Sequence, residues 1–127
     1  MTRSRASAKK AGSDFERKQA DCLALHVDDR IDRKVKTGAA DKGDIANLRA
    51  HNQKVTVEAK DYGGEIKAAA WAAEAAVERV NDKGLAWVVV AKRRGTTDPL
   101  KQWVLMEMGE LIALINGNRD HMEVEKF

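Results

Sequence analysis

The chain has 127 residues, enough for one domain with a single hydrophobic core, and a net charge of only +3. No long apolar run is present, so we expect neither a membrane-spanning helix nor a signal peptide. The single cysteine, Cys22, excludes an internal disulfide framework and fits a reducing, cytoplasmic compartment. The three histidines are scattered without the spacing of zinc ligands.

Basic residues are concentrated at the N-terminus. Residues 1–12 contain Arg3, Arg5, Lys9 and Lys10 and no acidic residue, whereas the rest of the chain is nearly neutral. This segment has no hydrophobic period, so we expect a disordered basic arm. Such an arm is either a solubilising tail or a contact to nucleic-acid phosphates.

A single domain is predicted over residues 13–116, and it begins with a helix from Ser13 to about Lys34. Ser13 and Glu16 match a capping box, in which glutamate follows serine after three residues. The apolar stripe at helical spacing comprises Ala20, Leu23, Ala24, Val27 and Ile31. Glu16 lies one turn before this stripe and continues it, so it either caps the helix or reaches the core side.

The next segment is predicted to form a β-hairpin. Residues 55–60 alternate small apolar with polar side chains, which is the period of a half-buried strand, so Glu58 and Lys60 point the same way. Residues 45–49 form a second run, and residues 50–53 are polar enough to turn the chain. A short strand over 35–39 is also expected.

Register decides whether the two acids of the hairpin meet. If Ala46 lies opposite Thr56, then Asp44 lies opposite Glu58 and both share a face with Lys60. A slip of one residue would put the two carboxylates on opposite faces. We expect the register in which they meet.

An alanine-rich helix is predicted from Glu65 to about Asp82. Its buried face is expected to comprise Ile66, Ala69, Ala70, Ala73, Val77 and Val80. Trp71 lies on the neighbouring line with Lys67, Glu74 and Glu78, and we expect it in a subunit contact, because large aromatic residues are enriched at interfaces. A position at the edge of the core is the alternative.

The last part of the chain continues the α/β pattern. Residues 85–91 are a continuous apolar run, typical of a buried strand, and residues 100–106 form the next strand after a basic loop. A helix over 107–116 is expected to be buried through Met108, Leu111, Ile112 and Ile115. Residues 117–127 form a tail of no clear pattern.

Asp44, Glu58 and Lys60 together indicate phosphodiester hydrolysis. Two neighbouring carboxylates repel each other unless a cation lies between them, and Mg²⁺ binds one or two carboxylates together with water and phosphate. A lysine beside the ion can orient water and offset the charge of a phosphate. The alternative is structural: Glu58 and Lys60 as a solvated pair, and Asp44 as a turn residue.

These residues resemble the PD-(D/E)xK nuclease superfamily, and the short chain with its leading helix looks most like the archaeal-type Holliday junction resolvases. The resemblance rests on Gly43-Asp44, thirteen intervening residues, and Glu58-Ala59-Lys60, with glycine in place of the proline of the motif. It implies that Asp44, Glu58 and the carbonyl of Ala59 hold Mg²⁺, for which Mn²⁺ substitutes. It also implies that Glu16 assists catalysis and that Lys60 activates or orients the attacking water.

The same resemblance implies a DNA substrate and a homodimer. We expect phosphate contacts from basic residues near the site: Arg33, Lys34, Lys36, Lys42, Lys67, Arg93 and Arg94. At Arg33 and Lys34 the alternative is a solvated helix end whose cations complement the helix dipole. Lys67 is also the polar side chain of its helix that we expect near the metal. The surfaces expected between subunits are the line around Trp71 and the last helix, with Leu114.

The predicted fold class is α/β, a restriction-endonuclease-like core of α-β-β-β-α-β-β-α order with a mixed sheet flanked by helices. The predicted function is a Mg²⁺-dependent, structure-selective DNA endonuclease, a Holliday junction resolvase that acts as a homodimer on four-way junctions in the cytoplasm, in association with the nucleoid. The alternatives are a nicking, flap or repair nuclease of the same superfamily, and a non-catalytic nucleic-acid-binding module with the same fold.

Overall fold

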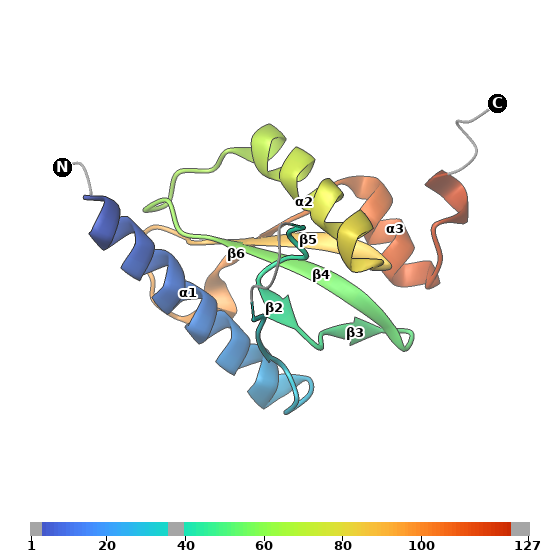
Figure 1. Cartoon of the computed structure of the whole chain (residues 1–127), viewed down its shortest axis with the longest axis horizontal. Helices are drawn as coiled ribbons and strands as arrows, with labels where there is room; N and C mark the ends of the chain where they lie inside the picture. The colour runs from blue at the N-terminus through green and yellow to red at the C-terminus, as the bar shows by residue number, and fades with distance from the viewer. Residues whose placement is uncertain (1–3, 36–39, 123–127) are drawn as a thin grey trace.

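A mixed β-sheet separates helix α1 (Arg5–His26) from helix α2 (Ala68–Asp82), and helix α3 (Met108–Asn116) packs at one end of the sheet (Figure 1). The computed structural model describes residues 4–35 and 40–122. The predicted α/β class with a mixed sheet is therefore confirmed.

The sheet has the strand order β1-β2-β4-β5-β6, and β3 also pairs with β4. Strands β4 and β5 run parallel, and every other pair is antiparallel. The strands are β1 (Asp32–Arg33), β2 (Ile45–Ala46), β3 (Arg49–Ala50), β4 (Gln53–Lys60), β5 (Ala86–Ala91) and β6 (Trp103–Leu105). Two short 3₁₀ helices, η1 (Pro99–Lys101) and η2 (Asp120–Met122), complete the fold.

The two central strands, β4 and β5, carry different kinds of side chain on their two faces. Toward α1, β4 and β5 present valines and alanines that form a core with Phe15 and Ala20. Toward α2, β5 presents Trp87 and Val89, which pack against Trp71. On this same face β4 presents only polar side chains: Thr56, Glu58 and Lys60. Because adjacent residues of a strand point to opposite faces, one strand supplies both an apolar core and a polar row.

Helix α1 begins eight residues earlier than predicted. It starts at Arg5, and the Ser4 hydroxyl caps it by accepting a 3.1 Å hydrogen bond from the backbone N–H of Ser7. The prediction of a disordered arm over 1–12 is therefore wrong for the described residues 4–12, because alanine, lysine and arginine are strong helix formers. The helix also ends at His26 rather than Lys34, where Asp28 accepts the N–H of Arg30 and turns the chain.

The hairpin has the predicted register, since Ile45 lies opposite Val57. In β3 the pairing shifts by one residue, with Arg49 opposite Lys54, so Asn47 is the extra residue of a β-bulge. The turn that follows has two residues with positive φ, as in the hairpin turns that match strand twist. Val35 is not in a strand, and residues 36–39 of the expected short strand lie outside the described part.

Helix α2 is oriented opposite to the prediction. It buries Trp71, Ala75, Glu78 and Asp82 against the sheet. The stripe predicted to be the core is exposed: Ile66, Ala69, Ala70, Ala73, Val77 and Val80. The polar row of β4 explains this orientation, because the polar line of α2 is the one that can pair with it. Trp71 belongs to the core, so the predicted subunit contact through Trp71 is wrong.

Helix α3 shows the same inversion. Met108, Leu111 and Ile115 are exposed and Ile112 is half-buried, whereas Glu110 and Ala113 are buried. Strand β6 covers only part of β5, and Glu110 occupies the uncovered edge by accepting the backbone N–H of Trp87 at 3.1 Å.

Arg119 completes this edge. It donates to the carbonyl of Leu85 at 2.9 Å and forms an ion pair with Glu110 at 2.7 Å. Two side chains thus replace a missing strand and satisfy the backbone there. Leu114 packs against the core and is half-buried, which argues against its predicted role between subunits. No helix of the described ranges is long and apolar enough to cross a membrane.

Candidate metal centre

Strand β4 places Glu58 and Lys60 on its α2 face, at the carboxyl end of the strand. Glu58 is buried, and its Oε1 lies 3.7 Å from the Nζ of Lys60. Both side chains thus point into the space between the sheet and α2, as the two-residue period predicts.

The turn before β2 brings a second carboxylate to Glu58. Gly43 has a φ of +93°, and a Cβ atom there would lie 2.9 Å from the carbonyl oxygen of Val57, so glycine is required for this approach. The next residue, Asp44, is buried and accepts the backbone N–H of Ala59 through Oδ2 at 2.8 Å. The side chain of Asp44 therefore replaces a backbone carbonyl as the partner of β4 at the point where pairing with β2 ends.

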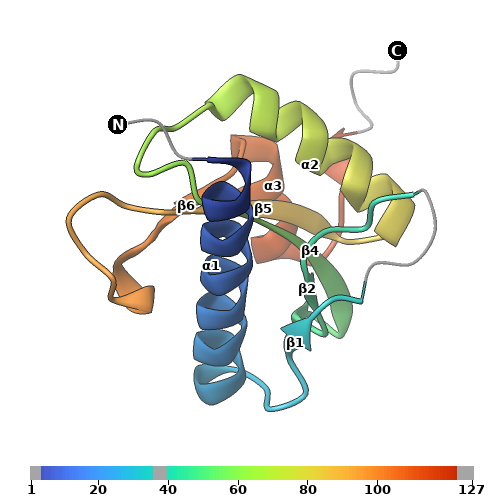
Figure 2. The same ribbon diagram turned by 60° about the vertical axis from the view of Figure 1, so that its left-hand side comes forward.

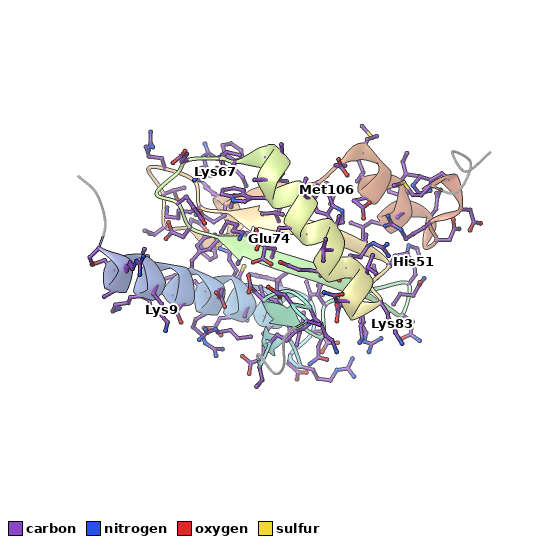
Figure 3. All side chains as sticks on the ribbon, turned by 45° about the horizontal axis from the view of Figure 1, so that its top comes forward. Lys9, His51, Lys67, Glu74, Lys83 and Met106 are labelled. Carbon is purple, nitrogen blue, oxygen red and sulfur yellow. The ribbon has the colours of Figure 1, made fainter. Side chains whose placement is uncertain are left out.

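Helix α2 adds two further carboxylates, Glu74 and Glu78, which are one turn apart on the face toward the sheet. In Figure 3 Glu74 lies between α2 and β4. Its two oxygens each accept a 3.0 Å hydrogen bond from the Nζ of Lys60. Lys60 is therefore held between Glu58 of its own strand and Glu74 of the helix.

Four acidic side chains converge here. Asp41, Glu58, Glu74 and Glu78 each offer an oxygen, and these oxygens all lie within 4.8 Å of one another. Asp41 also accepts the N–H of Gly43 at 2.9 Å, which fixes the loop in front of Asp44. Within residues 4–35 and 40–122, buried oxygens of this group lack a hydrogen-bond partner: Oε2 of Glu58 and both oxygens of Glu78.

The electrostatics of the group favour neutralisation. Burial raises the pKa of Glu58 far above its ordinary value, and the nearby Glu78 and Asp44 carboxyl groups raise it further. Burial also raises the pKa of Glu78; a hydrogen bond from Glu58 in its protonated form offsets part of this increase, and the charges of Asp41 and Glu74 add to it. Carboxylates in such a setting either retain protons or bind a cation.

The donor set fits a hard divalent cation. It consists of carboxylate oxygens without histidine or cysteine, the ligand type that Mg²⁺, Mn²⁺ and Ca²⁺ prefer. The unpartnered oxygens of Glu58 and Glu78 are the observation that supports this fit, because a bound cation would satisfy them.

The backbone of Ala59 provides a possible further ligand. Val55 donates its N–H to the carbonyl of Leu48, and the carbonyl of Val57 accepts the N–H of Asp44, so odd residues of β4 direct their peptide groups toward β2. The N–H of Ala59 follows the same rule by bonding Asp44. Its carbonyl therefore points to the Asp44 side, as the predicted role of a ligand requires.

Lys60 is a cation in this environment. Burial lowers the pKa of its ammonium group, but the hydrogen bond to Glu74 and the charge of Glu58 outweigh that effect and raise the pKa overall. In this state the side chain is a hydrogen-bond donor and a positive charge rather than a proton acceptor.

The structure brings together three of the four predicted catalytic residues: Asp44, Glu58 and Lys60. Asp44 is not one of the four clustered acids but lies beside Glu58 through its bond to the N–H of Ala59. Glu16, the fourth predicted residue, is also outside that group, and its Oε1 lies 3.5 Å from the guanidinium of Arg33. The sequence reasoning missed Asp41, Glu74 and Glu78. The sequence shows the two glutamates on one line of α2, but the apolar stripe of that helix predicts a different buried face.

The predicted phosphate-contacting residues that precede β2 in the chain either have intramolecular partners or are exposed. Lys34 donates to Asp82 at 3.0 Å and to the carbonyl of Lys42 at 2.8 Å, so its role is tied to the fold. Arg33 pairs with Glu16, and the side chain of Lys42 is exposed. Lys36 lies outside the described residues.

The remaining predicted phosphate contacts lie in and after the loops that follow β4 and β5, at the end of the sheet that carries Lys60. Lys67 is exposed, and its Nζ lies 4.9 Å from the centre of the Tyr62 ring. Arg93 stacks on Trp103, and Arg94 contacts the loop that follows β4.

Compared with models of protein families, with curated proteins and with solved structures, the chain gives no match. The fold and the site therefore define it by class: an α/β protein with a mixed sheet, in which an acidic group and one lysine lie between the sheet and a helix.

Proposed function

We propose that this protein is a metal-dependent DNA endonuclease of the PD-(D/E)xK type, and that a Holliday junction resolvase is the activity its site suits best. The observation that carries the proposal is the buried set of carboxylate oxygens without partners, from Glu58 and Glu78, beside the ammonium group of Lys60. A site that only bound nucleic acid would gain nothing from acids next to phosphate, because like charges repel.

Each residue has a part in this proposal. Asp44, Glu58 and the carbonyl of Ala59 hold the ion from the sheet side, and Glu78 does so from α2. When bound, Mg²⁺ would polarise a phosphate oxygen and lower the pKa of a water molecule. Lys60 donates hydrogen bonds to the attacking water or to a phosphate oxygen and offsets the charge that develops there.

Glu74 is a positioning residue for Lys60. Its two hydrogen bonds to the ammonium group fix the direction of a side chain that otherwise has many rotamers. For Glu16 to assist catalysis, its carboxylate must separate from Arg33 and turn toward the site when DNA binds.

The element order supports this assignment. A helix, an antiparallel set of strands, a second helix and a strand parallel to β4 are compatible with a restriction-endonuclease-like core. Asp44, directly before β2, and Glu58 of β4 lie together where the backbone pairing of these two strands ends, which suits an acidic pair of this type.

The proposed assembly is a homodimer, because paired cuts in branched DNA require two sites at a fixed separation. The outer face of α2, formed by Ala69, Ala70, Ala73, Val77 and Val80, is the proposed contact. Its small side chains let two helices approach closely, and a two-fold axis would place the same face on both partners.

A cleavage assay tests the proposal. The protein with Mg²⁺ is incubated with a four-way junction, a flap and a linear duplex of the same sequence, and the products are separated on a denaturing gel. We expect paired nicks in the junction and little cutting of the duplex. Preferential cutting of the flap would move the assignment to another nuclease of this type, and binding without any cutting would favour the non-catalytic module.

A further inference from the structure

Two exposed aromatic rings, each covered by a cation, lie near the metal centre. The ring of Trp103 is 4.3 Å from the guanidinium carbon of Arg93, and the ring of Tyr62 is 4.9 Å from the Nζ of Lys67. Trp103 is 49% exposed and Tyr62 is 46% exposed. A cation over an aromatic face holds that ring in one orientation.

Trp103 shares a row of the sheet with Lys60. Lys60 of β4 lies opposite Ala91 of β5, and Ala91 lies opposite Trp103 of β6. Residues directly opposite each other point to the same face, so Trp103 is on the face that carries the acidic group. Two strand spacings separate Lys60 from Trp103, roughly 10 Å.

The two aromatic residues belong to one surface. The loop after β4, which carries Tyr62, and the loop between β5 and β6 project at the same end of the sheet (Figure 2). Arg94 joins them through a 3.3 Å hydrogen bond from Nε to the carbonyl of Gly63. Asp61 is turned into its own loop, where it accepts the N–H of Gly63 at 2.9 Å.

Trp103 is not part of the hydrophobic core. The other two tryptophans, Trp71 and Trp87, are 2% and 1% exposed and fill the space between α2 and the sheet. Trp103 instead offers its indole to solvent beside Arg93, which is the combination that binds unpaired bases by stacking. Bases inside a duplex are stacked on one another and cannot offer their faces in this way.

We propose that Trp103 with Arg93, and Tyr62 with Lys67, form a stacking platform for unpaired bases next to the phosphate that is cut. The platform defines the substrate as DNA with unpaired nucleotides adjacent to the cleavage site. This proposal rests on the proposed nuclease function for the position of the phosphate, whereas the stacking itself is independent of cleavage.

The test uses the exposed tryptophan as its own probe, in EDTA so that no cleavage occurs. A short oligothymidylate should quench the tryptophan fluorescence of the full chain and reduce its further quenching by acrylamide. Both changes should report mainly on Trp103, because the other two tryptophans are buried. Trp103→Ala should remove most of the quenching and weaken binding about 5- to 150-fold in fluorescence anisotropy of a labelled oligothymidylate, since stacking contributes ~1–3 kcal/mol per base.

Matched variants separate stacking from a structural role. Trp103→Phe keeps an aromatic face and should retain most of the affinity. Val104→Ala changes the neighbouring exposed residue, which points to the other face of β6, and should leave binding unchanged. The proposal would be overturned if Trp103→Ala bound the oligothymidylate as tightly as the original chain. It would also be overturned if the main effect of Trp103→Ala were a loss of self-association, because Trp103 would then lie in a contact between copies of the chain.

The outcome also distinguishes this inference from the nuclease function. Quenching by the oligothymidylate without cleavage in Mg²⁺ would support the platform and argue against the nuclease. Cleavage that is insensitive to Trp103→Ala would support the nuclease and argue against the platform.

Discussion

Glu58 on β4 and Glu78 on α2 face each other across the interior, 5% and 1% exposed, and among the described residues three of their four carboxylate oxygens have no hydrogen-bond partner. A buried charge without a partner destabilises a fold. Left ionised, this pair would reduce the stability of the metal-free protein, so we expect it to retain a proton or to bind a cation.

A divalent cation should stabilise the fold through this pair. We expect Mg²⁺ or Mn²⁺ at about one hundred times its dissociation constant to add about 2.7 kcal/mol of unfolding free energy, measured by thermal denaturation. Glu58→Gln and Glu78→Gln should remove this response, and each should raise the unfolding free energy in EDTA by about 1–2 kcal/mol. Glu65→Gln, at an exposed position before α2, is the control and should change neither value. A metal response that survives both substitutions would place the ion elsewhere.

The stability of the metal-free protein should depend on pH in the direction set by Glu58. Its pKa is raised by burial from an unfolded value of 4.5, so the folded state holds a proton that the unfolded state has lost. Stability must therefore fall as the pH rises above about 4.5 toward the folded pKa. Urea denaturation between pH 5 and pH 8, in about equal steps, measures this slope. Glu58→Gln should flatten it, and an unchanged slope would contradict the assignment.

Lys60→Ala should separate cleavage from binding. Removing the ammonium group takes away a donor to the attacking water or the phosphate, so we expect cleavage in Mg²⁺ to fall by about 100-fold or more. Junction binding, measured by gel shift, should remain close to that of the original chain. Lys54→Ala is the control, because Lys54 is on the same strand and face but away from the acidic group. Unchanged cleavage by Lys60→Ala would contradict the mechanism.

Gly43 should tolerate substitution poorly because two constraints act there. Its φ of +93° is strained for other residues, and an added Cβ would lie 2.9 Å from the carbonyl of Val57. Gly43→Ala should therefore destabilise the fold by about 1–3 kcal/mol and displace Asp44. Gly95 has a similar φ of +87° but open space around it, so Gly95→Ala should cost less. Equal losses in urea denaturation would show that backbone strain alone matters.

The outer face of α2 should control self-association. Val77 is 61% exposed on a face without charged residues, and Val77→Asp should convert the proposed dimer to a monomer in sedimentation velocity. Leu25→Asp, another exposed apolar residue on a helix, should leave the oligomeric state unchanged. A chain that sediments as a monomer before any substitution would contradict the dimer itself.

Local patterns in the sequence were sufficient for the hairpin and its register. The alternation in residues 55–60 and the polar turn at 50–53 predicted that Asp44 and Glu58 would face each other, and the register confirms this. These features depend on neighbours in the chain and on the period of a strand, which are properties that a sequence displays directly.

Tertiary contacts decided which face of each helix is buried. The apolar stripe of α2 predicted one face, but the polar row of β4 selects the opposite one, because Glu74 and Glu78 meet Lys60 and Glu58 there. In α3 the uncovered edge of β5 similarly draws Glu110 inward. Hydrophobic periodicity assumes an apolar partner surface, so it cannot anticipate a strand that turns a row of charged side chains toward its helix. The residues that complete the acidic group, Asp41, Glu74 and Glu78, became visible only when the helix was placed on the sheet.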